Sequence, residues 1–406
     1  MNNRIAIVTS GYFPVPATKG GAVEALVENI INENERQGKL YLTVFSSFEE
    51  NAVDIAREYK NTEIVFVKTP KIIKLLDIFI FHLAKDFLKR EKTLSYRYIC
   101  RRLWFINKVS KYLNEKDYDK VLLENHSSLF LTLKRRGNAK KYKNNYYYHL
   151  HNVVTSDYGC REIICNTKKV LGVSNYINKT LQVYLGGTKI EYCVLRNMID
   201  SDKFRIKTTP IENEAIRQKY GIDNSYKIVL FTGRFSPEKG IKELLLAFRQ
   251  LDVSNTILLV VGGYYFDSGM HSSFEKEMKI LVDSMEGKVK FTGYVDYKKI
   301  PELYSIADIV VIPSVWDDPA PLTVIESLSS GKPLITTYSG GIPEYADENS
   351  AVILKRDNLV VALRDAMEDL LNNPTKCKQL SEKALNLTKS WGVKKYYEDF
   401  VKEILS

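Results

Sequence analysis

Short apolar runs rich in β-branched and aromatic residues recur through the first half of the chain and predict β-strands. They occupy residues 5–8, 42–45, 64–67, 121–123, 146–150 and 170–173. Between the first two runs, residues 22–38 carry apolar side chains at helical spacing and end on a glycine, which predicts a helix. Strands that alternate with helices predict a parallel sheet covered on both faces.

The second half repeats the same pattern after a polar stretch. Predicted strands occupy residues 228–231, 257–261, 289–291, 309–312, 334–336 and 352–354. The polar stretch covers residues 197–225 and contains Pro210, so it indicates a domain boundary. We therefore predict an α/β protein with two doubly wound parallel-sheet domains, residues 1–200 and 201–390.

Composition agrees with a folded protein of two domains. The 406 residues exceed one ordinary core, and 45% are hydrophobic while 27% are charged. A net charge of +10 favours anionic partners without choosing among them. The five cysteines, Cys100, Cys160, Cys165, Cys193 and Cys377, lack C-x-x-C spacing, so we expect neither a disulfide framework nor a structural zinc site, and we predict a cytoplasmic protein.

The N-terminus and the longest apolar stretch bear on membranes. Residues 1–8 lack the pattern of a signal peptide, and charged residues interrupt the apolar stretch of residues 72–88, so we expect no membrane span. Residues 68–111 nevertheless mix apolar side chains with many lysines and arginines. Two interpretations stay open: an amphipathic surface that docks on anionic membrane, or ordinary domain helices with solvated charges.

Loops that follow the predicted strands carry the candidate chemistry, because ligands of doubly wound sheets bind there. Gly20 and Gly21 open the first helix, where backbone N–H groups favour an anion, although a flexible loop would look the same. After residues 228–231, Arg234 and Lys239 bracket the start of the next helix. A guanidinium and an ammonium there can clamp a diphosphate, and two solvated cations are the alternative.

The loop after residues 309–312 supplies acidic groups and backbone amides. Asp318 lies on the loop and Glu326 about one turn into the following helix, where carboxylates can accept hydrogen bonds from sugar hydroxyls. The amides of Leu322 and Thr323 at the helix N-terminus are suited to a phosphate. Helix capping alone would also explain either carboxylate.

Histidines follow the strand of residues 146–150. His149 and His151 point to the same face of that strand, and only the one at its very end is expected to reach a ligand. For His149 we favour a structural role, and His126 is ambiguous. The sequence has no H-E-x-x-H motif and no G-x-S-x-G elbow, it has no cysteine cluster, and its glycine pairs lack the full G-x-G-x-x-G fingerprint. We therefore expect no metal site and no dehydrogenase.

Taken together, these segments resemble family 4 of the retaining glycosyltransferases, of the bacterial surface-polysaccharide type. The resemblance covers nearly the whole chain and is most specific in FTGRFSPEKGIKELLLAF, VKFTGYV, LYSIADIVVIPS and DPAPLTVIESLSSGKPLITTYSGGIPE. It implies the GT-B fold, in which two Rossmann-like domains face each other across a cleft. The first domain would bind the acceptor and the second the nucleotide sugar, and residues 391–406 would form a helix that crosses back to the first domain.

The resemblance also implies roles for individual residues. Arg234 and Lys239 match the pair that holds the donor diphosphate, in a loop that includes Gly233. Glu326 matches the acid that binds the nucleotide ribose, and Asp318 stands where a glutamate is usual. The remaining matches are Ala320, Pro321, Leu322 and Thr323, whose backbone amides would contact the sugar and diphosphate, Gly20 and Gly21 near the reacting centre, and His151, which would contact donor sugar and acceptor.

The function that the resemblance implies is retaining, metal-independent transfer of a hexosyl unit from a nucleotide-diphosphate sugar. UDP is the expected nucleotide, with GDP next, and the acceptor is a hydroxyl of a glycan or lipid-linked molecule in surface polysaccharide or lipopolysaccharide synthesis. No cofactor is expected, and the expected location is the cytoplasm, peripheral on the inner face of the plasma membrane in the docking interpretation. The alternatives are a non-catalytic partner subunit and a nucleotide-sugar epimerase of the same fold. Nucleic-acid binding rests on charge alone and is not expected.

Overall fold

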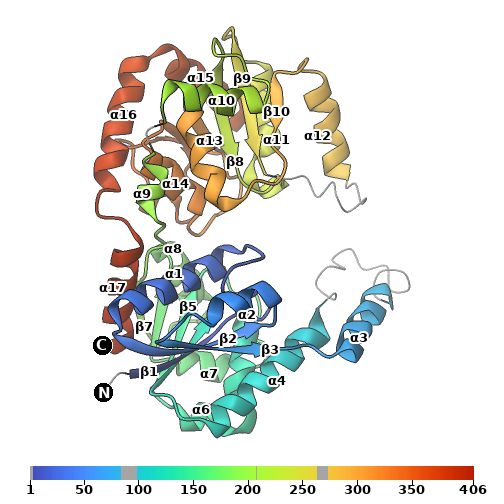
Figure 1. Ribbon diagram of the computed structural model, residues 1–406, viewed down its shortest axis with the longest axis vertical. Helices are drawn as coiled ribbons and strands as arrows, with labels where there is room; N and C mark the ends of the chain where they lie inside the picture. The colour runs from blue at the N-terminus through green and yellow to red at the C-terminus, as the bar shows by residue number, and fades with distance from the viewer. Residues whose placement is uncertain (1–2, 84–97, 207, 263–272) are drawn as a thin grey trace. The chain divides into compact units, whose positions relative to one another are not determined.

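The computed structural model describes residues 3–83, 98–206, 208–262 and 273–406. The chain divides into two compact units, and each is described by itself (Figure 1). The first unit comprises Met1–Asn197 together with Tyr396–Ser406, and the second comprises Met198–Lys395. Both units have an α/β architecture built on a parallel sheet.

The sheet of the first unit contains seven strands within the described residues, in the order β3-β2-β1-β4-β5-β6-β7. All neighbouring strands are parallel. The strands are β1 (Asn3–Val8), β2 (Leu40–Ser47), β3 (Thr62–Val67), β4 (Lys120–Glu124), β5 (Tyr146–Leu150), β6 (Lys169–Gly172) and β7 (Glu191–Val194).

The described helices of the first unit lie between these strands in the chain, except that α17 lies near the end of the chain. They are α1 (Ala22–Gln37), α2 (Glu50–Ala56), α3 (Lys71–His82), α4 (Ile99–Glu115), α5 (Leu131–Lys134), α6 (Asn138–Lys141), α7 (Arg161–Cys165), α8 (Asn175–Leu185) and α17 (Val393–Leu405), with 3-10 turns η3 (Ser127–Phe130) and η4 (Arg135–Gly137). α1 forms as predicted: Leu26, Val27, Ile30 and Ile31 are buried along one stripe, and Gly38 ends the helix in the left-handed conformation.

The sheet of the second unit has six parallel strands in the part of the chain that the structure describes, in the order β10-β9-β8-β11-β12-β13. The strands are β8 (Lys227–Thr232), β9 (Thr256–Val261), β10 (Val289–Phe291), β11 (Ile309–Ile312), β12 (Leu334–Thr337) and β13 (Val352–Leu354). The helices are α9 (Ser201–Phe204), α10 (Pro210–Lys219), α11 (Ile241–Arg249), α12 (Ser273–Asp283), α13 (Ile300–Ile306), α14 (Leu322–Ser330), α15 (Leu359–Asn372) and α16 (Pro374–Leu387), with η5 (Pro237–Lys239), η7 (Tyr297–Lys299) and η8 (Ile342–Glu344). The prediction of two parallel α/β domains is confirmed.

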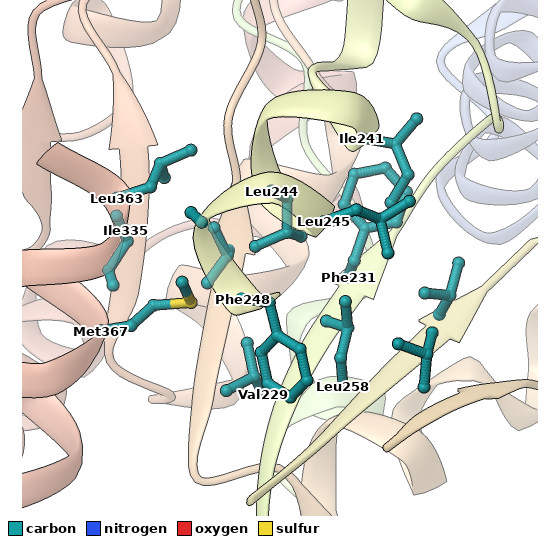
Figure 2. Packing of buried hydrophobic residues seen from close by; sticks show 14 of the residues in the cluster. Val229, Phe231, Ile241, Leu244, Leu245, Phe248, Leu258, Ile335, Leu363 and Met367 are labelled. Carbon is teal, nitrogen blue, oxygen red and sulfur yellow. The ribbon is translucent and has the colours of Figure 1, made fainter. Parts of the chain in front are cut away.

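One continuous core holds α11 and α15 against the second sheet (Figure 2). Val229, Phe231 and Leu258 from the strands pack with Leu244 and Phe248 of α11, and all five are buried. Burying such side chains contributes roughly 1.5–3 kcal/mol each relative to exposure. The core therefore fixes where α11 begins, directly after the loop that follows β8.

Each sheet has a point where the strand order reverses. In the first sheet the reversal lies between β1 and β4, and in the second between β8 and β11. At such a point the two adjacent connections leave toward opposite faces, so the carboxyl ends of the strands are open to a ligand. The loops after β1, β4, β8 and β11 are thus the parts of the fold best placed to bind one.

Two features were not predicted. β7, with the sequence Glu-Tyr-Cys-Val, is an edge strand whose first residue is exposed and whose other three residues are partly buried. The polar boundary stretch contains α9 and α10. A capping box between Thr209 and Glu212, with Pro210 at the first helical position, starts α10.

The last helix, α17, packs into the first unit. Tyr396, Tyr397, Phe400 and Ile404 are buried on one face of it. The Tyr397 hydroxyl donates to Asn34 Oδ1 in α1 at 2.5 Å. The far end of the chain therefore supplies part of the core of the unit with which the chain begins.

We expect Phe400→Ala to destabilise the first unit by about 3–5 kcal/mol, because it removes a fully buried ring and leaves a cavity. Denaturant unfolding monitored by amide hydrogen exchange of the first unit measures the change. The matched control is Leu405→Ala on the same helix, whose side chain is 39% exposed. Equal effects of the two substitutions would contradict this account of α17.

Candidate active site

The loops after β8 and β11 approach each other closely in the second unit. Gly240 has φ 70° and leads into α11, and a Cβ built on it would overlap the carbonyl oxygen of Pro313, the first residue after β11. Gly233 has φ 147°, which a side chain also disfavours. Gly240 is therefore required by the close approach of the two loops, and Gly233 by the conformation of its own backbone.

Arg234 and Lys239 lie on the loop after β8 but in different environments. The Arg234 side chain is 65% exposed, and its guanidinium is 3.7 Å from Glu238 Oε1. Lys239 is mostly buried; its ammonium forms an ion pair with Asp318 and lies 5.8 Å from the centre of the Trp316 ring. The structure thus brings Lys239 and Asp318 together and leaves Arg234 accessible to solvent.

The N-terminus of α14, which follows Asp318 in the chain, presents backbone N–H donors. α14 begins at Leu322 after Pro321, and none of the described side chains caps it with a hydrogen bond. The first N–H groups of a helix lack partners within the helix and attract anions. Within the segment Ala320–Thr323, the N–H groups of Leu322 and Thr323 therefore suit an anionic ligand, whereas Pro321 has no N–H to donate.

Glu326, in the second turn of α14, is a buried acid. Its Oε2 accepts a hydrogen bond from the Tyr304 hydroxyl at 3.1 Å, and Tyr304 is also within 2.8 Å of Thr232 Oγ1 at the end of β8. Burial raises the pKa of Glu326 to about 7, although hydrogen bonds from Tyr304 and Tyr297 act in the opposite direction. An acid held in this way accepts hydrogen bonds strongly once ionised.

Gly20 and Gly21 precede α1 in the first unit, both with positive φ. A Cβ on Gly21 would overlap the Glu24 carboxylate, so the chain passes directly over that side chain. Glu24 is buried and accepts a hydrogen bond from Ser10 Oγ at 3.0 Å. Burial raises the pKa of Glu24, and nearby Glu124 acts in the same direction.

Glu124, His149 and His151 form a buried cluster at the ends of β4 and β5. His149 Nδ1 is 3.0 Å from Glu124 Oε2, and His151 Nε2 is 3.3 Å from the same oxygen. The two imidazole centres are 4.1 Å apart, as expected for side chains on one face of a strand. His149 is completely buried, in keeping with the structural role favoured for it, and His151 is 6% exposed.

Glu124 was not predicted as a site residue, yet the sequence carried a signal for it. It follows directly after the predicted strand of residues 121–123, as His151 follows the strand of residues 146–150. Parallel neighbours end at the same edge of a sheet, and β4 pairs with β5 with Glu124 opposite His149. His126 lies apart from this cluster: its Nδ1 accepts from the Ser128 N–H, and burial lowers its pKa to about 4.

The same cluster is the one group of three found among the described residues that could hold a metal ion. Glu124, His149 and His151 each offer one ligand atom, and these atoms lie within 4.8 Å of one another. The same atoms are at hydrogen-bond distances from each other. The geometry therefore accommodates a hydrogen-bonded network.

Comparison with known proteins bears on this site. Residues 212–387, which include the loops after β8 and β11 and the whole of α14, match the family model described as glycosyl transferases group 1. Of the predicted site residues, Gly233, Arg234, Lys239, Asp318, Ala320, Pro321, Leu322, Thr323 and Glu326 lie inside the matched residues, whereas Gly20, Gly21 and His151 lie in the first unit.

Relatives and solved structures extend the similarity to most of the chain. A putative glycosyltransferase of Bacillus subtilis, YtcC, is 24% identical over 83% of this chain and 75% of its own. The lipopolysaccharide 1,2-N-acetylglucosaminetransferase of Salmonella typhimurium is 25% identical over 66% of this chain and 67% of its own. The crystal structure of Anabaena HepE in complex with UDP-glucose matches with a TM-score of 0.72 and 17% identity over 99% of both chains. The fold is thus that of the GT-B glycosyltransferases, and the relatives support glycosyltransferase activity.

We expect Glu326→Gln to remove a pH dependence of stability. A carboxyl whose pKa is raised from 4.5 to about 7 in the folded state loses stability as pH rises between these values, because the unfolded state ionises first. Relative to wild type, the variant should gain about 2–3 kcal/mol between pH 5 and pH 8. Denaturant unfolding at both pH values measures this gain. Glu382→Gln, on an exposed face of α16, is the control, and an equal gain there would contradict the assignment.

Proposed function

We propose that this protein is a retaining glycosyltransferase that transfers a hexosyl unit from a UDP-sugar to a hydroxyl of a glycan or lipid-linked acceptor. The observation that carries the proposal is the arrangement at the reversal point of the second sheet. Two basic residues, an uncapped helix N-terminus and a buried acid come from the loops after β8 and β11. This combination suits a nucleoside diphosphate, whose phosphates are anionic and whose ribose carries hydroxyl donors.

Each residue has a proposed role in donor binding. Arg234 and Lys239 neutralise the diphosphate and stabilise it as it leaves, and the N–H groups of Leu322 and Thr323 bind its oxygens. Gly233, Ala320 and Pro321 shape the loops around it. Glu326 accepts hydrogen bonds from the ribose. Asp318, which pairs with Lys239, accepts a hydrogen bond from the sugar.

No metal is required for this chemistry. Two cations and a helix N-terminus supply the positive field that a divalent ion supplies in other phosphate sites. UDP is proposed because a structure of the same fold, HepE, is a complex with UDP-glucose. Synthesis of surface polysaccharide or lipopolysaccharide is proposed from relatives such as the Salmonella lipopolysaccharide enzyme.

The first unit is proposed to bind the acceptor. Gly20 and Gly21 lie between β1 and α1, at the reversal point of the first sheet, where a ligand is expected, and His151 follows β5, the neighbour of β4. His151 would contact the acceptor hydroxyl and the donor sugar. The hydroxyl then attacks the anomeric carbon on the face from which the diphosphate leaves, so the configuration is retained.

We expect Arg234→Ala to lower kcat/KM for UDP-sugar turnover by about a hundredfold, since one lost charge-stabilising contact has this typical cost. Because Arg234 is exposed and its ion pair with Glu238 is long, the folded state should be unaffected. UDP release with a panel of UDP- and GDP-sugars, with and without EDTA, measures turnover. The matched control is Arg249→Ala, on an exposed position at the end of α11.

Several outcomes of that assay would contradict the proposal. Turnover of Arg234→Ala within about threefold of wild type would remove the diphosphate role from Arg234. Loss of activity with EDTA would contradict metal independence. Binding of a nucleotide sugar without any transfer would favour a non-catalytic partner, and a changed configuration in the sugar nucleotide without acceptor would favour an epimerase.

We further propose that the protein docks on an anionic membrane surface and there binds a lipid-linked acceptor. None of the described helices is long and apolar enough to cross a bilayer. The expected docking surface covers residues 68–111, of which residues 84–97 lie outside the described residues. Within the described part, α3 carries exposed apolar side chains on Ile72, Leu75, Leu76, Ile78 and Phe79, followed by Leu83.

Charge on α3 favours an anionic partner. Asp77, the only acidic residue of the helix, is buried and accepts the backbone N–H groups of Cys100 and Arg101 at 2.7 and 3.1 Å. The acid therefore serves to hold the start of α4, while Lys71 and Lys74 accompany the exposed apolar side chains. An apolar helix surface with lysines at its edge is typical of interfacial helices on anionic lipid.

We expect the double variant Leu75→Glu/Phe79→Glu to lose binding to anionic vesicles while remaining folded, because both side chains are more than 60% exposed. Co-sedimentation with phosphatidylglycerol and with phosphatidylcholine vesicles at low salt measures binding. Val183→Glu on α8, where the side chain is 75% exposed, is the control. Wild-type protein that fails to sediment with anionic vesicles would refute membrane docking.

A further inference from the structure

The buried cluster of Glu124, His149 and His151 is held rigidly by the segment that follows β4. Asn125 has a positive φ, and its backbone N–H donates to the His149 carbonyl at 2.7 Å. Its side-chain oxygen accepts the His151 N–H at 3.3 Å, and its carbonyl accepts the Tyr148 hydroxyl at 2.7 Å. The backbone around His151 is therefore fixed relative to Glu124 by hydrogen bonds from one residue.

Charge within the cluster is carried by Glu124. Burial alone would raise the pKa of Glu124, but the adjacent His149 and His151 hold it at about 2, so the carboxyl is ionised. Burial, followed by repulsion from His149, lowers the pKa of His151 to about 4, which leaves that imidazole neutral near pH 7. A neutral imidazole has one nitrogen that donates and one that accepts.

The carboxylate decides which nitrogen of His151 carries the hydrogen. An ionised carboxylate can only accept hydrogen bonds, and His151 faces Glu124 Oε2 with its Nε2 at 3.3 Å. Nε2 is therefore the protonated nitrogen, and Nδ1 keeps its lone pair. His149 donates to the same carboxylate from Nδ1, so the negative charge is satisfied from both sides.

We propose that Glu124 is a positioning residue for sugar transfer, which fixes His151 as the Nε2–H tautomer and so keeps His151 Nδ1 as an acceptor for a substrate hydroxyl. The proposal rests on the proposed function for the identity of that hydroxyl. The tautomer itself follows from the cluster. Glu24 of α1 is the other acid near Glu124, and it is held by Ser10 rather than by the histidines.

Imidazole ¹⁵N spectra of histidine-labelled protein test the tautomer directly. The chain contains five histidines, so the resonances can be assigned by substitution. In wild type we expect His151 to show a protonated Nε2 and an unprotonated Nδ1. In Glu124→Gln we expect a mixture of tautomers, because an amide can donate as well as accept, and in Glu124→Asp a return toward the wild-type pattern. A wild-type His151 protonated at Nδ1 would overturn the proposal whether or not any variant folds.

Kinetic measurements then distinguish a positioning role of Glu124 from a general effect on the stability of the fold. We expect Glu124→Gln to lower kcat by about tenfold to a hundredfold while the donor KM changes by less than about threefold, since the donor diphosphate contacts are untouched. The matched control is Glu191→Gln in β7 of the same sheet, an exposed acid paired with Lys169. A rise in donor KM without a fall in kcat, or an equal loss in the control, would overturn the positioning role.

The same samples test the alternative occupant of the cluster. Zinc is titrated into EDTA-treated wild type and into Glu124→Gln, with binding followed by a chromophoric chelator. No stoichiometric binding supports the hydrogen-bonded network, whereas one zinc per chain that depends on Glu124 would overturn it. A Glu124-dependent tautomer in a protein that transfers no sugar would leave the network standing and refute the proposed function instead.

Discussion

Parallel pairing of the strands is the constraint on which both candidate sites depend. Each unit is a single parallel sheet whose strand order reverses once. Parallel strands end at the same edge, so residues far apart in the chain meet there without any direct sequence relationship. Glu124 and His151 come together because β4 pairs with β5, and Lys239 and Asp318 come together because β8 pairs with β11.

Buried charge at these edges distinguishes the sites from ordinary core. Glu326 lies in an environment that raises its pKa to about 7, and Glu124 is ionised only because two imidazoles surround it. Taking a carboxylate out of water is costly unless it is paired, and strongly perturbed acids at a strand edge are typical of functional sites. The two buried carboxyl groups have different hydrogen-bond donors: Glu326 accepts from neutral hydroxyl groups, whereas Glu124 accepts from imidazole nitrogens.

Sequence reasoning recovered the elements whose pattern is local. Every predicted strand of the two sheets is present, and α1 begins and ends near the expected residues, because continuous apolar runs and helical stripes are properties of neighbours in the chain. β7, a four-residue edge strand that begins with an exposed glutamate, was not predicted. α10 was not predicted because a capping box starts it within a stretch that is otherwise polar.

The candidate site was less accessible to sequence reasoning than the fold. Arg234, Lys239 and Glu326 could be chosen because each stands at a strand end or helix start, but the Lys239–Asp318 pair depends on how two loops approach. The same is true of Glu124. The sequence shows that it follows a strand, but its contacts with two histidines can be predicted only when the order of the strands in the sheet is known. Burial and pKa follow from packing, which no local pattern contains.

The environment of Asp318 explains how one shorter acid fits a site built for charge neutralisation. The Asp318 carbonyl accepts the Gly341 N–H at 2.8 Å, and a Cβ on Gly340 would overlap the Asp318 backbone, so the loop after β12 holds this segment in place. With its backbone fixed, the carboxylate reaches Lys239 and neutralises it in the absence of ligand. A diphosphate brings more negative charge than one carboxylate and adds the exposed Arg234 and the amides of α14 as partners. Under the proposed function, donor binding would therefore exchange a buried ion pair for a larger set of charge-assisted hydrogen bonds, and the released Asp318 would accept from a sugar hydroxyl.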